Sequence, residues 1–259
     1  MKKSVLILGI AISSVAVFGC GSDSSPVTTQ PDETQAPSTE PAMGGTQTAN
    51  PASEYCISQG GTLEMVVLNS GILASVAKEM TVLDFPFLFA NAKEADAVVD
   101  GPYGKKMHDK LQEKGIVGLA YWELGFRNMT NSKRAINKVE DLAGLKIRVI
   151  PNPINLDWVK ALDANPTPMA FGEVYGAMES KAIDGQENPL NVILANKFAE
   201  VQKHLTLTNH VYNPQSVIVS KKFWDGLNAA EKKIITDAVA EATQTQRKVA
   251  RDAASGNLA

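Results

Sequence analysis

Apolar residues are concentrated near the start of the chain, are scarce over residues 21–53, and then return in short segments to the end. The first apolar run extends from Val5 to Phe18 and follows Lys2 and Lys3. At about fourteen residues, this run is shorter than the roughly twenty that a transmembrane helix needs. A short apolar run after positive charges is typical of a secretory signal peptide. We therefore predict a signal peptide over residues 1–19.

The residues directly before Cys20 are small or apolar, and the segment Val17-Phe-Gly-Cys20 resembles the cleavage box of bacterial lipoproteins. The resemblance implies cleavage before Cys20 and attachment of lipid to this cysteine. More than one acyl chain makes such an anchor stable, because each buried CH₂ contributes about 0.8 kcal/mol. The alternative is an ordinary signal peptide followed by a chance cysteine. We expect a periplasmic or cell-envelope protein that is lipid-anchored to a membrane.

Residues 21–53 are rich in Ser, Thr, Pro, Gln and Gly and contain few large apolar side chains. A segment of this composition cannot bury enough apolar surface to offset the entropy lost on ordering. We therefore predict a disordered tether over residues 20–53 and a folded domain over residues 54–259.

In the folded part, short apolar segments alternate with segments of helical spacing. The patterns predict strands over 62–68, 116–122, 146–150 and 216–220, and a strand followed by a loop over 182–189. They predict helices over 93–114 with a break at Gly101-Pro102, and over 156–162, 172–181 and 198–204. Asn228 and Glu231 resemble a capping box at the start of a last long helix. This alternation favours an α/β fold with mostly parallel strand pairing.

The charge balance argues against a nucleic-acid-binding surface. The chain has 25 Lys and Arg against 28 Asp and Glu, a formal net charge of -3, and no basic tract. Cys20 and Cys56 lie too far apart for a CxxC pair, and the three histidines His108, His204 and His210 form no metal-binding pattern. No metal or cofactor is therefore expected. The sequence also contains no GxSxG, P-loop or GxGxxG motif, which favours a binding protein over an enzyme.

Arg148 is placed where an anion would be expected to bind. It lies near the end of the strand predicted over 146–150, which Pro151 terminates, and open α/β sheets bind ligands outside the carboxyl ends of their strands. A guanidinium group can donate two parallel hydrogen bonds to a carboxylate. The alternative is a surface arginine paired with a nearby acid.

Two further polar positions follow or interrupt apolar segments. Arg127 comes after the strand predicted over 116–122, and its alternative is a salt-bridged surface residue. Asn188 lies in the polar segment Asp184-Gly-Gln-Glu-Asn-Pro189, whose alternative is a turn built from Asx-type hydrogen bonds. A hydrolase that uses Glu187 or His210 is disfavoured, because neither residue has a nucleophile or a metal-ligand pattern near it in sequence.

From about Gly61 to Arg251, the chain resembles the dicarboxylate-binding (DctP-like) solute-binding proteins of tripartite ATP-independent periplasmic (TRAP) transporters. The matching segments are Val82-Leu-Asp-Phe-Pro-Phe-Leu-Phe89, Gly125-Phe-Arg-Asn-Met-Thr-Asn-Ser-Lys133, Asp141-Leu-Ala-Gly-Leu-Lys-Ile-Arg148, Ala164-Asn-Pro-Thr-Pro-Met-Ala-Phe171, Glu173-Val-Tyr175 and Asp184-Gly-Gln-Glu-Asn-Pro189. The resemblance implies a two-lobed, type II periplasmic-binding-protein-like α/β fold. It also implies binding of a C4-dicarboxylate or related organic acid and delivery of that acid to a membrane permease.

The resemblance also assigns roles to single residues. Arg148 would form the salt bridge to the ligand carboxylate, and Asn188 would help to hold that carboxylate. Arg127 would be a second carboxylate contact or a support, and Phe171 would pack on the ligand. The weaker candidates for ligand contact are Asn69, Tyr212 and Glu187.

Two stretches depart from this family pattern. Residues 50–64 occupy the place of the family's first strand–helix–strand unit and resemble instead a small hemolysin-like, cysteine-containing lipoprotein family. The chain also stops soon after the long helix, at Ala259. We therefore expect an incomplete first lobe and a well-folded second lobe. The alternatives are a lipid-anchored envelope interaction protein, or a truncated or recombined binding protein without function.

Overall fold

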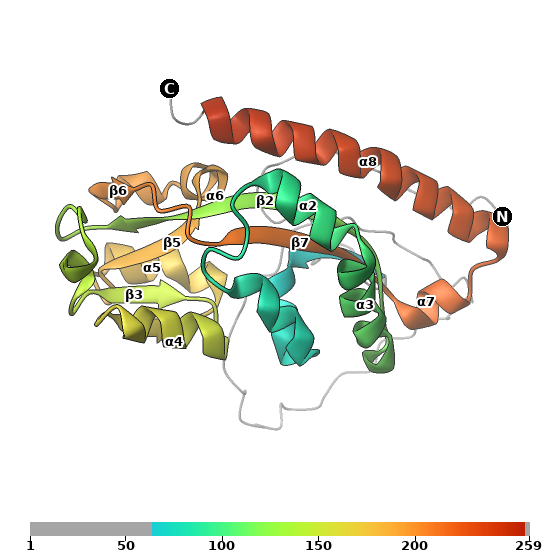
Figure 1. The fold of residues 1–259 in the computed structure, drawn as a ribbon, viewed down its shortest axis with the longest axis horizontal. Helices are drawn as coiled ribbons and strands as arrows, with labels where there is room; N and C mark the ends of the chain where they lie inside the picture. The colour runs from blue at the N-terminus through green and yellow to red at the C-terminus, as the bar shows by residue number, and fades with distance from the viewer. Residues whose placement is uncertain (1–63, 257–259) are drawn as a thin grey trace, which may run out of the picture.

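The computed structural model describes residues 64–256, whose strands form one mixed sheet (Figure 1). The predicted signal peptide, Cys20, the tether and Cys56 lie outside the described residues. The strands are β1 (Met65–Asn69), β2 (Ile116–Asn131), β3 (Lys146–Val149), β4 (Asn165–Pro168), β5 (Gly185–Pro189), β6 (His204–Thr206) and β7 (Tyr212–Ser220). They are ordered β1-β7-β2-β5-β3-β4, and β6 also pairs with β2.

Helices and 3₁₀ turns connect these strands. The helices are α2 (Ala92–Val99), α3 (Pro102–Leu111), α4 (Pro153–Ala161), α5 (Val174–Glu179), α6 (Leu190–Ala195), α7 (Lys221–Asp225) and α8 (Ala229–Gly256). The 3₁₀ turns are η1 (Ser70–Ser75), η2 (Lys78–Asp84), η3 (Gln112–Lys114), η4 (Val139–Leu142), η5 (Phe171–Glu173) and η6 (Phe198–Glu200).

The expectation of mostly parallel pairing is wrong. Among the described strands, the β3–β4 and β3–β5 pairs are parallel. The β1–β7, β2–β7, β2–β5 and β2–β6 pairs are antiparallel. Hydrophobic alternation reports which face of a strand is buried, but it does not report the direction of the neighbouring strand. The antiparallel pairs join segments that are far apart in sequence, which is why the local pattern did not reveal them.

β2 and β7 are both longer than their apolar segments predict. β2 continues past residue 122 to Asn131, and β7 begins at Tyr212 rather than at 216. Their pairing runs from Ile116–Ser220 to Phe126–Tyr212 and contains two register shifts, one of them at Gly125. Gly125 has a φ of 116°, which a glycine adopts without the steric cost that a side chain would bring. Beyond this ladder, β2 continues into its pairing with β5 and β6, so that β2 extends through both halves of the molecule (Figure 1).

The predicted break at Gly101-Pro102 is confirmed. Helix α2 ends at Val99, and α3 begins with Pro102 at its first turn, where proline loses no intrahelical hydrogen bond. The two helices pack closely, since a Cβ added at Gly104 would lie 1.8 Å from the carbonyl oxygen of Val99.

The capping box of the last helix is also confirmed. The Asn228 side chain accepts a hydrogen bond from the backbone N–H of Glu231 (3.0 Å), and the Glu231 carboxylate accepts one from the backbone N–H of Asn228 (3.0 Å). The other predictions were less accurate in their boundaries. Residues 198–204 contain a short 3₁₀ turn instead of the predicted helix, and the helix predicted over 172–181 is divided into η5 and α5.

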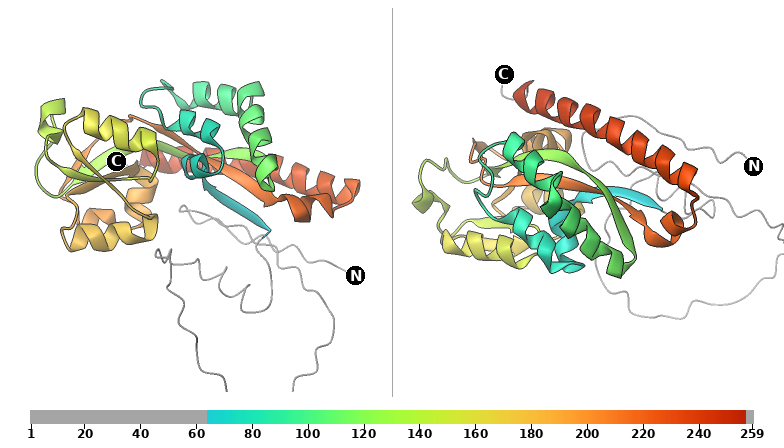
Figure 2. Two further views of the ribbon diagram at one scale, coloured as in Figure 1. Left: turned by 90° about the horizontal axis from the view of Figure 1, so that it is seen from below. Right: turned by 45° about the vertical axis from the view of Figure 1, so that its right-hand side comes forward.

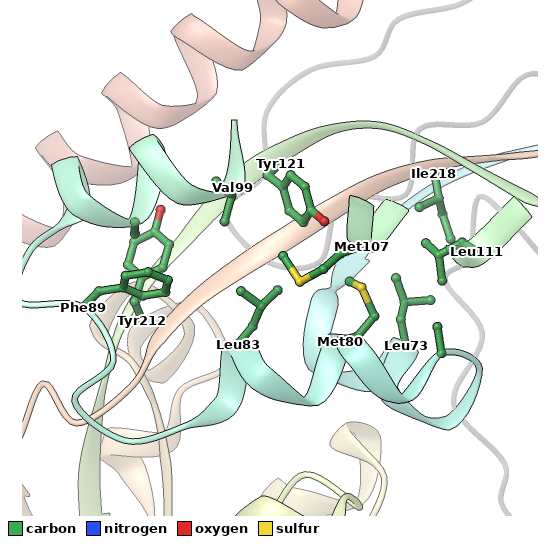
Figure 3. Close-up of a cluster of buried hydrophobic side chains, with 12 residues drawn as sticks. Leu73, Met80, Leu83, Phe89, Val99, Met107, Leu111, Tyr121, Tyr212 and Ile218 are labelled. Carbon is green, nitrogen blue, oxygen red and sulfur yellow. The ribbon is translucent and has the colours of Figure 1, made fainter. Parts of the chain in front are cut away.

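The elements form two halves, one around the β2–β7 pairing and the other around the β2–β5 pairing. In the half that we call the first lobe, η1, η2, α2 and α3 pack on β1, β7 and the start of β2. Figure 3 shows Met80 and Leu83 of η2 pointing toward Met107 and Leu111 of α3. These apolar contacts hold the 3₁₀ turns against the sheet and thereby position Asp84, the last residue of η2.

The second lobe contains β3, β4, β5 and β6, the end of β2, and helices α4, α5 and α6. Two separate apolar clusters stabilise it: one includes Ile147 and Val159, and the other includes Met178 and Ile193. Helix α8 lies along the outside of the molecule, as Figure 1 and the right-hand view of Figure 2 show, and reaches α6 through a hydrogen bond from Asn191 to the Ala250 carbonyl (3.0 Å). No helix within residues 64–256 is long and apolar enough to cross a membrane.

Candidate functional site

Arg148 lies inside the second lobe, on β3 between β4 and β5. Its side chain is 3% exposed, and its Nε and Nη2 groups donate to the Met169 carbonyl oxygen at 3.2 and 2.8 Å. No carboxylate forms an ion pair with it among the described residues. The alternative prediction was a surface arginine paired with an acid. It is wrong, because Arg148 is buried and has no acidic partner among the described residues.

The charge on Arg148 persists at neutral pH despite burial. Burial lowers its pKa to about 10, and the positive charge of Arg127 acts in the same direction, while Glu187 and Glu173 oppose them. A group with this pKa remains protonated at pH 7. The second lobe therefore contains a buried cation whose only hydrogen-bond partner in the described part of the chain is a neutral carbonyl.

Phe171 is brought next to this guanidinium group by η5. The Phe171 ring centroid lies 6.0 Å from Cζ of Arg148 and 5.9 Å from the ring of Phe198. The ring is half-buried, so one part of it packs on the α5–α6 cluster and the rest is accessible. In the sequence, only the family resemblance linked Phe171 with Arg148. The structure places the two side chains next to each other.

Arg127 is buried within β2 and does not follow the strand as the sequence suggested. Its side chain is 2% exposed, and it donates to Glu187 Oε1 (2.8 Å) and to Asn213 Oδ1 (2.7 Å), with a further ion-pair contact from Nε to the same glutamate. The alternative of a salt-bridged residue is thus correct for the ion pair, but the pair lies in the interior and not on the surface.

Glu187 connects Arg127 to His210. Its Oε2 atom lies 3.2 Å from Nε2 of His210, whose Nδ1 contacts the Thr208 hydroxyl at 2.7 Å. Burial alone would raise the pKa of Glu187, but Arg127 and His210 together lower it to about 2. Glu187 is therefore ionised at neutral pH and holds Arg127 through their ion pair.

Asn188 lies in the middle of a regular β pairing, so the alternative of a turn is wrong. It sits opposite Asn128 in the β2–β5 ladder and is buried. Its Nδ2 group donates to Gln186 Oε1 at 2.5 Å, and Gln186 in turn donates to the Thr130 hydroxyl at 2.9 Å. This chain of hydrogen bonds fixes the polar face of β5.

The two remaining candidates have different surroundings. Asn69 donates to Asn213 Oδ1 at 2.6 Å and so joins the group around Arg127. Tyr212 belongs instead to the apolar core of the first lobe, where its ring makes edge contacts with Phe89 (6.0 Å) and Phe126 (5.3 Å). Burial raises the pKa of Tyr212, so its hydroxyl stays neutral.

The structure adds polar residues that the sequence did not single out. Asn152 caps α4 by accepting from the backbone of Asn155 (3.0 Å) and donates to the carboxylate of Asp84 at 2.5 Å. Asp84 belongs to the first lobe and α4 to the second, so this hydrogen bond joins the two lobes. The signals in sequence were an acidic residue between apolar neighbours and an asparagine directly before Pro153, but neither indicated the other.

Burial also alters the chemistry of Asp84, whose side chain is 1% exposed. Burial raises its pKa to about 6, Arg127 and the hydrogen bond from Asn152 lower it, and Glu187 raises it further. Arg127 therefore has two carboxylates in its electrostatic field, only one of which it contacts. No cluster of three or more His, Cys, Asp or Glu side chains within residues 64–256 is arranged to hold a metal ion.

An apolar groove of about 1060 Å³ lies elsewhere, on the first lobe between η2 and the α2–α3 pair. Its lining shares no residue with the polar group around Arg127 and Arg148. We therefore place the candidate site at the buried arginines and not in this groove. Residues that line the groove include Val82, Leu83, Leu88, Val98, Tyr103 and Met107.

Residues 47–259 match the family model DctP, described as bacterial extracellular solute-binding protein, family 7. The chain is 41% identical over 191 residues to the 2,3-diketo-L-gulonate-binding periplasmic protein YiaO of Escherichia coli, a match that covers 74% of this chain and 58% of YiaO. It is 38% identical over 175 residues to the C4-dicarboxylate-binding periplasmic protein DctP of Rhodobacter capsulatus, covering 68% of this chain and 52% of that protein. The chain thus spans less than two thirds of the length of these relatives.

Solved structures with the same arrangement include proteins bound to two kinds of acid. The sugar acid binding protein DctPAm from Advenella mimigardefordensis, in complex with galactonate, superposes with a TM-score of 0.75 and 48% identity over 78% of this chain and 64% of that chain. A TRAP periplasmic solute binding protein from Sulfurospirillum deleyianum with bound succinate gives a TM-score of 0.75 and 34% identity over 82% of this chain and 69% of that chain.

Proposed function

Because the chain belongs to family 7 of the bacterial extracellular solute-binding proteins, the DctP family, we propose that it binds a carboxylate-containing organic acid for a TRAP transporter. The observation that carries this proposal is the buried Arg148, which has no carboxylate partner in the described residues. This family consists of binding proteins and not of enzymes. Both a C4-dicarboxylate and a sugar acid fall within the proposed class.

The energetics of Arg148 favour an anionic ligand. A buried charge that lacks a counter-ion is costly, and the cost falls when a carboxylate supplies both opposite charge and hydrogen bonds. Nη1 of Arg148 makes no hydrogen bond to any residue between 64 and 256, so it can donate to a ligand. A charge-assisted hydrogen bond of this kind contributes roughly 1.5–3 kcal/mol.

The neighbouring residues take supporting roles in this proposal. Arg127 is neutralised by Glu187, so the local charge that attracts an acid comes from Arg148. Asn188 lies on β5, next to β3, and would help to hold the carboxylate, while Phe171 would pack on the carbon skeleton. Arg127 then acts mainly by positioning β5 through Glu187.

Thermal unfolding of the purified protein with a panel of acids tests the proposal. Galactonate or succinate should raise Tm by several degrees, because a ligand that binds only the folded state stabilises it. Arg148→Ala should remove the shift, whereas Arg134→Ala, which removes an exposed arginine from a loop, should retain it. If no acid in a broad panel shifts Tm, the binding function is wrong.

We also propose that the bound acid is passed to the membrane permease of the transporter, and that the chain is exported and lipidated at Cys20 after removal of residues 1–19. The support is the sequence pattern before Cys20 and the tether composition of residues 20–53. Mass spectrometry of the mature protein from a bacterial host should show an acylated N-terminal cysteine. Cys20→Ser should release the protein from the membrane fraction, and an unmodified mature N-terminus at another residue would contradict this step.

A further inference from the structure

The described sheet ends in two edge strands, β1 and β4, which differ in how they are protected against further pairing. β4 contains Pro166 and Pro168, which have no backbone N–H, so this edge cannot present a full row of donors. Folded proteins usually block an open edge with proline, charge or a bulge. β1 has the sequence Met-Val-Val-Leu-Asn, and its register with β7 contains no shift, so it carries none of these features.

The outward backbone groups of β1 follow from its pairing with β7. The N–H of Ser220 donates to the carbonyl oxygen of Glu64 at 2.8 Å, and the antiparallel register continues from there along β1. In such a ladder, every second residue directs its backbone groups away from the partner strand. On β1 these residues are Met65, Val67 and Asn69. No strand within residues 64–256 pairs with this side of β1, which lies at the margin of the sheet in the left view of Figure 2.

Both faces of β1 are apolar. Val66 and Leu68 pack against the core of the first lobe, whereas Met65 and Val67 pack in the cluster that includes Val239 of α8. Of the four β1 side chains, only Val67 is fully buried, and the other three are half-buried. Two apolar clusters therefore end, partly exposed, at the same strand edge. A strand that covers this edge needs apolar side chains on both of its faces.

We propose that this edge pairs with the same edge of a second copy of the chain, so that two first lobes share one continuous sheet. β1 itself has two apolar faces and no charge, so it is the kind of strand that its own edge requires. A two-fold axis at Val67 places this residue opposite its own copy and Met65 opposite Asn69 of the copy, which brings the outward backbone groups together. The same axis places Val66 opposite Leu68 of the copy, so both apolar clusters continue across the axis.

The paired segment is short, so the dimer should be weak. A standard interface involves about 20–30 residues a side, whereas β1 contributes five. We expect a dissociation constant on the order of micromolar. In the strand order, β7, β2 and β5 lie between β1 and β3, the strand of Arg148. The dimer is therefore independent of the proposed acid binding, and the failure of either proposal leaves the other intact.

Sedimentation of the full chain at increasing concentration tests the pairing, in a background with Cys20→Ser and Cys56→Ser that removes both native thiols. The chain should change from monomer to dimer. Val66→Lys should raise the dissociation constant at least about tenfold, because a lysine at a free edge reaches water but would lie inside the sheet of the dimer. Thr167→Lys, at a half-buried position of β4, is the matched control and should leave the dimer unchanged. A chain that stays monomeric, one that forms larger oligomers, or a dimer that Val66→Lys does not weaken would overturn the proposal.

Disulfide trapping in the same background tests the register. Val67→Cys should give a disulfide-linked dimer on oxidation, because directly opposite residues with mutual hydrogen bonds have Cα atoms about 5.5 Å apart, within the range of a disulfide. Leu68→Cys is the control on the same strand and should not cross-link, because it lies diagonal to its own copy at about 7–8 Å. Cross-linking of Leu68→Cys in preference to Val67→Cys, or of both equally, would overturn the two-fold pairing. If Val66→Lys does not fold, these two cysteine variants still decide.

Discussion

The Arg127–Glu187 pair shows how a single buried interaction can determine the position of a whole strand. Arg127 belongs to β2 and Glu187 to β5, and the adjacent residues Asn128 and Asn188 face each other in the ladder. Removing one partner of a buried ion pair leaves the other charge without compensation, which typically costs 3–5 kcal/mol. An exposed ion pair, by contrast, contributes about 0–1 kcal/mol.

Glu187→Gln should therefore lower the free energy of unfolding by about 3–5 kcal/mol, measured by urea denaturation. The exposed pair Lys105–Asp109 provides the control, since Asp109→Asn should cost less than about 1 kcal/mol. Similar losses for the two variants would show that the buried pair does not carry the stability assigned to it.

Asp84 and Glu187 lie near the same arginine but respond to it in opposite ways. Glu187 contacts Arg127 directly and has a lowered pKa, whereas burial dominates at Asp84 and raises its pKa from 3.8 to about 6. Between these two pH values the folded state holds the Asp84 proton and the unfolded chain does not. The folded state then binds more protons, so the Asp84 contribution to stability falls as pH rises through this range.

This effect predicts that the stability of Asp84→Asn increases relative to that of the wild type as pH increases from 4 to 7. The full difference corresponds to roughly 3 kcal/mol, because one pKa unit is equivalent to 1.36 kcal/mol. Urea denaturation at several pH values measures it, and subtraction of the wild-type curve cancels the titration of all other groups. Asp225→Asn, on the exposed end of α7, should show no such dependence. A constant difference between Asp84→Asn and wild type would contradict the raised pKa.

At the scale of elements, the sequence predicted those features that depend on local chemistry. The break at Gly101-Pro102 and the capping box at Asn228 follow from residues within a few positions of each other, and both are confirmed. Arg148 was correctly placed near the end of a strand for the same reason. The direction of strand pairing and the polar contacts between the lobes depend on distant segments, such as Asp84 with Asn152, and no local pattern encodes them.

Helix α8 is held to the first lobe by charged side chains as well as by apolar packing. Arg247 donates to both carboxylate oxygens of Asp100 (2.6 and 2.8 Å) and to the Tyr121 carbonyl (2.7 Å). Arg251 contacts Asp96 (2.7 Å) and Glu123 (2.6 Å) one turn further along. The helix is therefore attached through β2 and α2 at the same time.

Arg247→Ala should lower the free energy of unfolding by about 2–4 kcal/mol, because it leaves the buried Tyr121 carbonyl and Asp100 without their donor. The adjacent Lys248 makes only an exposed pair with Asp252, so Lys248→Ala should change stability by less than about 1 kcal/mol. Hydrogen exchange should also become faster in α8 of Arg247→Ala. Unchanged exchange in that helix would show that apolar packing alone holds it.

At the scale of the whole molecule, two kinds of connection join the lobes. Strand β2 runs continuously from its pairing with β7 in the first lobe into its pairing with β5 and β6 in the second lobe, and the hydrogen bond between Asp84 and Asn152 joins side chains of both lobes across the boundary. Strand β2 is covalently continuous, whereas the Asp84–Asn152 hydrogen bond can break without unfolding either lobe. Movement between the lobes would therefore change the Asp84–Asn152 hydrogen bond first.

This arrangement predicts which of the three tryptophans reports ligand binding. Trp158 of α4 lies beside His210, with the two ring centroids 5.0 Å apart, whereas Trp122 donates to Thr243 on α8 and Trp224 contacts Lys232. A ligand beside Arg148 should change the emission of Trp158, because its polar neighbours would be rearranged. Trp158→Phe should remove the fluorescence change that galactonate or succinate causes, while Trp122→Phe and Trp224→Phe should retain it. If the change is lost in Trp122→Phe and kept in Trp158→Phe, the acid alters the contact between β2 and α8 and not the junction between the lobes.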